Sequence, residues 1–140
     1  FSPYWKSRRL PKGGVVEQVM GACLMMRPLE KFDERFFLYC EDTELCRRLR
    51  RHGKIMYEPK ATFTHALGAS SSDNRWRSVA YYNRGKELYF RIHHGPIASL
   101  ICLGLNRMGA ILRILAGGLI TAKALTFWRV LLAPVNPYPR

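Results

Sequence analysis

The chain has 140 residues, of which 48% are hydrophobic and 24% are charged. This length fits about one domain, and this balance excludes a disordered chain. Lys and Arg number 23 against 10 Asp and Glu, which gives a net charge of +13 and predicts a polyanionic partner such as nucleic acid, anionic lipid or a phosphorylated substrate. Because the sequence opens on Phe1 without a targeting signal, we expect it to be a fragment of a longer protein.

The first elements are a basic arm and an apolar segment. Residues 1–14 are rich in Pro, Gly, Lys and Arg, which predicts a loop or a mobile arm. Residues 15–27 are mostly apolar and are interrupted by Gly21. This pattern predicts a buried strand, or two short strand pieces, with a close backbone approach at the glycine.

A helix and two further strands are predicted next. Residues 42–52 place apolar side chains on one face, carboxylates at the start and arginines at the end, and Gly53 is a natural stop. Residues 54–58 and 61–66 have the composition and alternation of short strands. Residues 75–94 return to a helical pattern with many basic side chains.

The C-terminal region is the most hydrophobic part of the sequence. Residues 96–121 do not form a clean transmembrane span, because three polar or basic residues interrupt them: Asn106, Arg107 and Arg113. With residues 123–133 they predict one or two amphipathic helices lying in a membrane interface, with basic side chains at the level of the headgroups. The alternative is a long helix pair that covers the core of a soluble protein.

The carboxylates Glu41 and Asp42 stand at the start of the predicted helix, directly after an aromatic run. The helix dipole and the free backbone N–H groups favour an ionised carboxylate there, which suits a base that takes a proton from a hydroxyl. The alternative is that Asp42 is an N-cap and Glu41 an exposed neighbour. The aromatic run favours a functional role, because it would hold both carboxylates at the end of a buried element.

Two further features concern possible ligands. His65 follows a short strand and precedes a Gly/Ser-rich loop, where an imidazole can ligate Mn²⁺ or a similar ion beside carboxylates; the alternative is an ordinary structural histidine. The basic run RRLRRHGK at 47–54 is typical of a solvated helix face. Because the sequence has no interleaved aromatic platform and no nucleic-acid-binding signature, we predict no nucleic-acid partner.

Several motifs occur in a fixed order within residues 15–95. They are GA at 21 and 22, FDE-FF-Y-ED-ELC-R at 32–47, G-I-Y-P-A at 53–61, H-G-S at 65–70 and YYNRGKELYF…HHG at 81–95. In this order they resemble the C-terminal half of family 2 glycosyltransferases with the GT-A fold, especially the rhamnosyltransferase- and galactofuranosyltransferase-like branch. The resemblance implies an α/β fold, the C-terminal part of a GT-A (Rossmann-like) domain, followed by amphipathic C-terminal helices. Residues 1–95 would be the acceptor-side half of the catalytic domain, and residues 96–140 the basic membrane-interface helices.

The resemblance also implies an activity and a role for each motif residue. Such enzymes transfer a sugar, with inversion, from a nucleotide-diphosphate donor to a hydroxyl of a glycan or lipid-linked acceptor. The second acid of the ED pair, Asp42, would be the catalytic base, and Glu41 would line the acceptor pocket. Gly21 and Ala22 would border the donor sugar and the acceptor. His65 would help to hold a divalent metal, Mg²⁺ or Mn²⁺.

One element of the family pattern is missing from this sequence. The family's nucleotide-binding half carries a DxD metal motif N-terminal to this region, and the aspartates here form no such motif. The resemblance therefore implies that the donor site lies largely outside this chain and that the fragment alone is inactive. We expect a peripheral protein at the cytoplasmic face of the membrane, bound to an anionic surface. The alternative is a non-catalytic basic module that binds a membrane surface.

Overall fold

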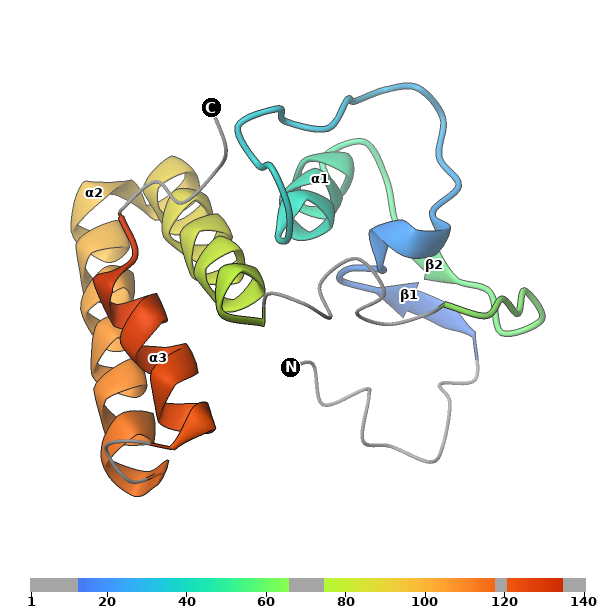
Figure 1. The fold of residues 1–140 in the computed structure, drawn as a ribbon. Coiled ribbons are helices and arrows are strands. Elements are labelled where there is room, and N and C mark those ends of the chain that lie inside the picture. Colours follow the sequence, from blue (N-terminus) through green and yellow to red (C-terminus); the bar gives the residue numbers. More distant parts are fainter. Residues whose placement is uncertain (1–12, 66–74, 118–120, 135–140) are drawn as a thin grey trace. The chain divides into compact units, whose positions relative to one another are not determined.

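The computed structural model describes residues 13–65, 75–117 and 121–134 (Figure 1). Of these residues, 59% are helical and 6% lie in strands. The elements are, in chain order, β1 (Gly14–Val16), the 3-10 turn η2 (Gly21–Cys23), α1 (Glu41–Leu49), β2 (Ile55–Tyr57), α2 (Arg75–Gly117) and α3 (Ala122–Leu132). They belong to two compact units. The first comprises the described residues up to Asp33 and residues 42–65, and the second comprises residues 34–41 and those from 75 onward.

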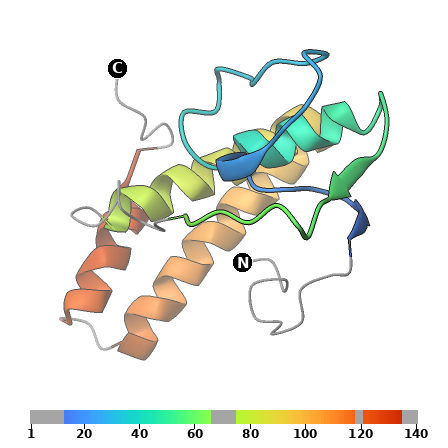
Figure 2. The same ribbon diagram turned by 90° about the vertical axis from the view of Figure 1, so that its right-hand side faces the viewer.

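The first unit contains the sheet and nearly all of α1. β1 and β2 pair antiparallel, with Val15 opposite Met56, and Figures 1 and 2 show the two strands side by side. The predicted amphipathic helix is confirmed as α1, which buries Leu45 and Cys46 completely. Its arginines follow at the C-terminal end, where they complement the helix dipole.

The expected α/β fold is wrong for the described residues, because they contain only one two-stranded antiparallel sheet. After Val16 the apolar segment leaves strand pairing, and the Cys23 amide donates to the Met20 carbonyl (3.3 Å) in the turn η2. Residues 61–65 are exposed and have no regular secondary structure. An alternating sequence forms a strand only where a neighbouring strand satisfies its N–H and C=O groups. The GT-A (Rossmann-like) fold predicted for residues 1–95 is therefore incorrect.

The second unit is built on the long helix α2, which is bent at Gly95 (φ 88°, ψ 175°). Glycine adopts this positive φ without a side-chain clash, and the following Pro96 has no N–H to continue the helix. The bend divides α2 into an N-terminal half, residues 75–94, and a C-terminal half, residues 96–117. Ser99 lies after the bend, yet its hydroxyl donates to the Glu87 carbonyl (2.9 Å), so the halves fold back on each other. Figures 1 and 2 show α3 beside the C-terminal half.

The aromatic run before the acid pair also belongs to the second unit. Phe36 is buried, and the ring of Tyr39 meets the ring of Tyr82 edge to face at 6.1 Å between centroids. Tyr39 and Cys40 both have left-handed backbone conformations (φ 71° and 66°). A Cβ at Gly85 would lie 2.6 Å from the Tyr39 carbonyl oxygen, so only glycine lets α2 approach this turn so closely. The helices predicted over residues 75–94 and 96–133 are thus confirmed as α2 and α3.

Candidate functional site

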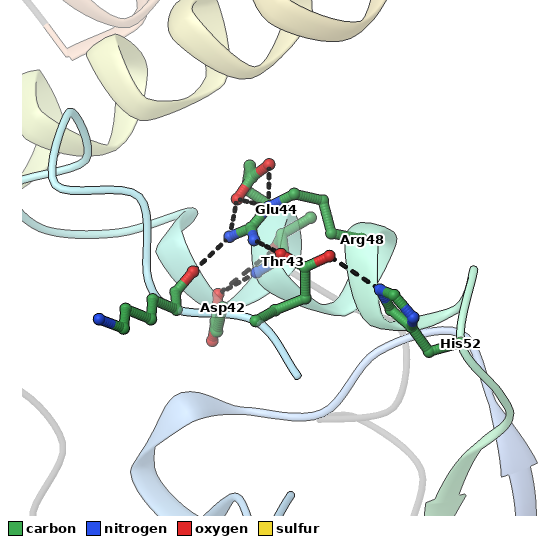
Figure 3. Close-up of polar contacts among 7 residues, drawn as sticks. Asp42, Thr43, Glu44, Arg48 and His52 are labelled. Carbon is green, nitrogen blue, oxygen red and sulfur yellow. Dashed lines mark hydrogen bonds and ion pairs between the residues drawn. The ribbon is translucent and has the colours of Figure 1, made fainter. Parts of the chain in front are cut away.

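Asp42, the predicted base, lies half-buried in the first turn of α1. Its Oδ1 accepts the backbone N–H of Thr43 (2.7 Å), and its Oδ2 accepts the backbone N–H of Gly21 (3.1 Å). Figure 3 shows the Asp42–Thr43 contact at the start of α1. Both carboxylate oxygens are therefore held by backbone amides, which fixes the orientation of the group.

Gly21 and Ala22 lie in the turn η2, so the strand predicted for them is wrong. The Gly21 amide, which a strand would use for pairing, instead donates to Asp42, 21 residues later. A Cβ at Gly21 would lie 3.3 Å from the Cβ of Asp42, and this tight contact explains a glycine at the position. The thiol of Cys46 faces the Val19 carbonyl oxygen (3.8 Å), and this second contact joins α1 to the segment before the turn. The structure thus brings together two of the predicted site positions, Gly21 and Asp42.

The other predicted site residues are less well connected. Glu41 is half-buried and belongs to the second unit, whereas Asp42 belongs to the first. His65 is exposed in the irregular segment 61–65. Within residues 13–65, 75–117 and 121–134, no three His, Cys, Asp or Glu side chains lie close enough together to hold a metal ion. One surface hollow lies beside β1 and another between α2 and α3, and Asp42 and His65 line neither. A metal site at His65 stays a prediction.

Arg48 organises a polar cluster further along α1 (Figure 3). Its Nε donates to both carboxylate oxygens of Glu44 at 2.9 Å, and Glu44 is only 2% exposed. Its Nη1 meets Glu30 at 2.5 Å, and its Nη2 donates to the Lys31 carbonyl at 2.6 Å. The other oxygen of Glu30 lies 2.9 Å from the His52 ring. The sequence prediction placed Arg48 on a solvated face and missed this role, although the i,i+4 spacing from Glu44 is a signal for such a pair.

The electrostatics of this cluster follow from its contacts. The pKa of Glu30 is lowered by the hydrogen bond to His52 first and by that to Arg48 second. The pKa of Arg48 is raised, chiefly by its hydrogen bond to Glu44. The cluster attaches the segment at 30–31 to the body of α1 and so fixes the helix whose first turn carries Asp42.

A second polar network lies in the helices of the second unit. Glu87 is 5% exposed, and its carboxylate accepts the side-chain amide of Asn106 (2.8 Å). The carbonyl oxygen of that amide accepts the Lys86 ammonium (2.7 Å). In the sequence Asn106 interrupts the apolar segment that was predicted to lie in a membrane interface. It instead joins the two halves of α2, because a buried carboxylate requires a hydrogen-bond donor.

Arg107 has a similar internal role. Its guanidinium donates to the carbonyl oxygens of Val130 (2.6 Å), Leu131 and Ala133 (2.8 Å), where α3 ends. The last carbonyls of a helix have no intrahelical partner, and a cation there also complements the dipole. Arg107 therefore fixes the end of α3 beside the middle of the C-terminal half of α2. Arg113, in contrast, is exposed and donates to the Gly109 carbonyl (2.8 Å).

The arrangement around Asp42 permits one kind of chemistry. A partly exposed carboxylate in a fixed orientation can accept a proton from a hydroxyl. The chain matches no protein-family model, no curated protein and no solved structure.

Proposed function

We propose that this chain supplies the acceptor-side part of an inverting glycosyltransferase. Such an enzyme moves a sugar from a nucleotide-diphosphate donor to a hydroxyl of a glycan or lipid-linked acceptor. The observation that carries the proposal is the hydrogen bond from the Gly21 amide to the Asp42 carboxylate. It joins the GA and ED motifs, which the family resemblance assigns to one reaction centre and which lie far apart in the sequence.

The backbone directly before the acid pair supports this assignment. Tyr39 and Cys40 are two consecutive non-glycine residues in the left-handed region. Each such residue costs on the order of 1–3 kcal/mol and persists only where the surroundings impose it, which is typical of functional sites. Gly85 supplies the close contact that accommodates the turn. The chain thus accepts strain in the turn that leads directly into the acid pair.

Proton transfer in the proposed reaction involves Asp42 alone. Its carboxylate takes the acceptor's hydroxyl proton while that oxygen attacks the anomeric carbon. The new oxygen–carbon bond forms on the face opposite to the diphosphate, and the bond from the anomeric carbon to the diphosphate oxygen breaks. A divalent metal would offset charge on the departing diphosphate. The described residues do not by themselves form such a site, so His65 as its ligand stays a prediction.

Asp42→Asn in the intact protein tests the proposal. Transfer is measured with a panel of UDP- and dTDP-linked sugars, and donor binding is measured separately. Loss of a general base lowers turnover by about 10²- to 10⁴-fold, while donor binding is unchanged. Glu58→Gln, an exposed acid in the same unit, is the matched control and should keep full turnover. Retained turnover in Asp42→Asn would exclude the base assignment.

The same assay distinguishes sugar transfer from the alternative function. A basic membrane-surface module without chemistry would bind vesicles but would neither transfer nor hydrolyse any sugar nucleotide of the panel. The intact protein would then show no activity that Asp42→Asn could lower.

A further inference from the structure

We propose that the C-terminal half of α2 docks, with α3, on a bilayer of anionic lipid, and that the axis of this helix lies in the membrane plane. This inference goes beyond sugar transfer and does not depend on it. It starts from the apolar face of that helix half, defined by its exposed large apolar side chains. They are Ile97, Leu100, Ile101, Leu105, Met108, Ile111, Leu112 and Leu115.

The apolar face is long, continuous and uncharged. Its members are 44% (Ile111) to 73% (Ile97) exposed, and they recur every three or four residues, so they lie along one side of the helix. At about 1.5 Å per residue, residues 96–117 extend for about 33 Å. Monomeric soluble proteins rarely leave so large a contiguous apolar surface in water. The face therefore requires a covering partner.

The opposite side of the same helix is already covered. Cys102, Ala110 and Ile114 are buried, and Ser99 and Asn106 bond to the N-terminal half. One side of the helix thus packs on protein while the other stays bare. This is the distribution expected of a helix that lies at a lipid interface with the rest of its unit above it.

A spanning orientation is disfavoured, although α2 is long and apolar enough to cross a membrane. Asn106 lies midway along residues 96–117 and holds Lys86 and Glu87. Arg107, beside it, holds the end of α3. A spanning helix would place these groups at the bilayer centre, where ionisable side chains are costly. An in-plane helix keeps all of them on its protein side, away from the hydrocarbon.

The positive charge of this region favours anionic lipid as the partner that covers the apolar face. No Asp or Glu follows Glu87, whereas five Lys and Arg residues do besides the internal Arg107: Arg91, Arg113, Lys123, Arg129 and Arg140. Exposed Arg129 lies beside exposed Trp128 on α3, and Trp is common at membrane interfaces. A second copy of this chain would bring like charges together. Anionic headgroups would instead place negative charge beside these positive side chains, so binding to lipid is favoured over self-association.

Vesicle flotation of the full chain tests the docking surface. We expect flotation with vesicles of mixed phosphatidylglycerol and phosphatidylcholine, and little with phosphatidylcholine alone. Leu112→Asp, at a 58% exposed position, should weaken partitioning at least tenfold without unfolding the chain. Met25→Asp makes the same charge change at a 99% exposed position of the first unit and should float like the unmodified chain. Equal flotation of both variants would overturn the proposal, as would a lipid-independent dimer that Leu112→Asp dissociates.

The in-plane orientation needs a measurement of depth. The three native tryptophans are first replaced by Trp5→Phe, Trp76→Phe and Trp128→Phe, and this chain must still float with the vesicles. A single tryptophan is then introduced in turn by Ile101→Trp, Met108→Trp or Leu115→Trp. Quenching by lipids brominated near the headgroup or near the bilayer centre reports the depth of each. Equal, shallow depths are expected. A depth that increases from one end of the helix toward its middle would overturn the orientation. None of these readouts uses sugar transfer, so their failure leaves the assignment of Asp42 intact.

Discussion

The two units of the chain each bury a carboxylate, but they satisfy it in different ways. In the first unit Glu44 is neutralised by Arg48, one helical turn away on α1. In the second unit Glu87 depends on Asn106, 19 residues away across the bend in α2. The first pair needs only that α1 forms, whereas the second forms only if the helix folds back on itself. A local contact thus stabilises one helix, and a distant contact fixes a tertiary arrangement.

Removal of the Arg48 side chain should lower the free energy of unfolding more than any other change considered. Arg48→Ala removes the guanidinium that neutralises the buried carboxylate of Glu44, and breaking a buried ion pair costs about 3–5 kcal/mol. Hydrogen exchange of the α1 amides should accelerate accordingly, while the amides of α3 are unchanged. Arg51→Ala, at an exposed position just after α1, should change protection by less than about 0.5 kcal/mol. Equal effects of the two variants would contradict the role given to Arg48.

Gly85→Ala should break the second unit where α2 meets the turn at 39–40. The new methyl group would lie 2.6 Å from the Tyr39 carbonyl oxygen, and overpacking of this kind costs about 3 kcal/mol. Gly104→Ala is the matched control, because no atom lies within 4 Å of the added methyl group and the helix gains up to about 1 kcal/mol. Urea unfolding should move in opposite directions for the two variants. A neutral Gly85→Ala would show that the turn does not pack on α2.

Asn106→Ala tests the contact across the bend. It removes a donor from Glu87 and an acceptor from Lys86, and a buried carboxylate without its donor costs about 2 kcal/mol. Protection from hydrogen exchange should fall in both halves of α2 together. If only residues near 106 lose protection, the two halves do not form one cooperative unit.

Lowering the pH should have the smallest effect on the free energy of unfolding among these changes. This effect arises from Glu30. Its pKa is lowered in the folded chain from the ordinary value of 4.5, by His52 and then Arg48. The contribution to stability is therefore complete above pH 4.5 and is lost as the pH falls through the lower folded value. Glu30→Gln should flatten this part of the stability profile measured by urea unfolding between pH 3 and pH 6. An unchanged acid dependence in the variant would show that other carboxylates cause it.

The sequence predicted the helices well and the sheet poorly. The periodicity of residues 42–52 and of residues 96–133 predicted α1, the C-terminal half of α2, and α3, because a helix satisfies its own backbone. The strand predicted over 54–58 is confirmed as β2, whereas only residues 15 and 16 of the segment 15–27 lie in a strand and residues 61–65 form none. Alternation in a sequence does not say whether a partner strand exists. Among the four arginines after Cys46, Arg48 is the one that stands four residues after Glu44, so this pair could have been predicted. Only the fold adds the second carboxylate, Glu30.

The candidate site was predicted in part. The family resemblance pointed to Gly21 and Asp42, and the structure brings them into contact, although no spacing rule relates residues so far apart. Asn106 and Arg107 belong to the segment that was predicted to lie in a membrane interface. Both instead make contacts inside the second unit, because the buried carboxylate of Glu87 and the end of α3 each require a polar partner. The close contact at Gly85 gave no signal beyond a glycine inside a helical pattern, which costs stability unless packing requires it.

The proposed reaction centre depends most directly on the Asp42 carboxylate accepting the Gly21 amide hydrogen. Amide hydrogen exchange of the ¹⁵N-labelled chain, followed at one fixed pH, measures this contact. We expect the Gly21 amide to be protected from exchange and to lose that protection in Asp42→Ala, which removes the acceptor. A Gly21 amide that exchanges equally fast in both chains would contradict the contact and with it the proposed reaction centre.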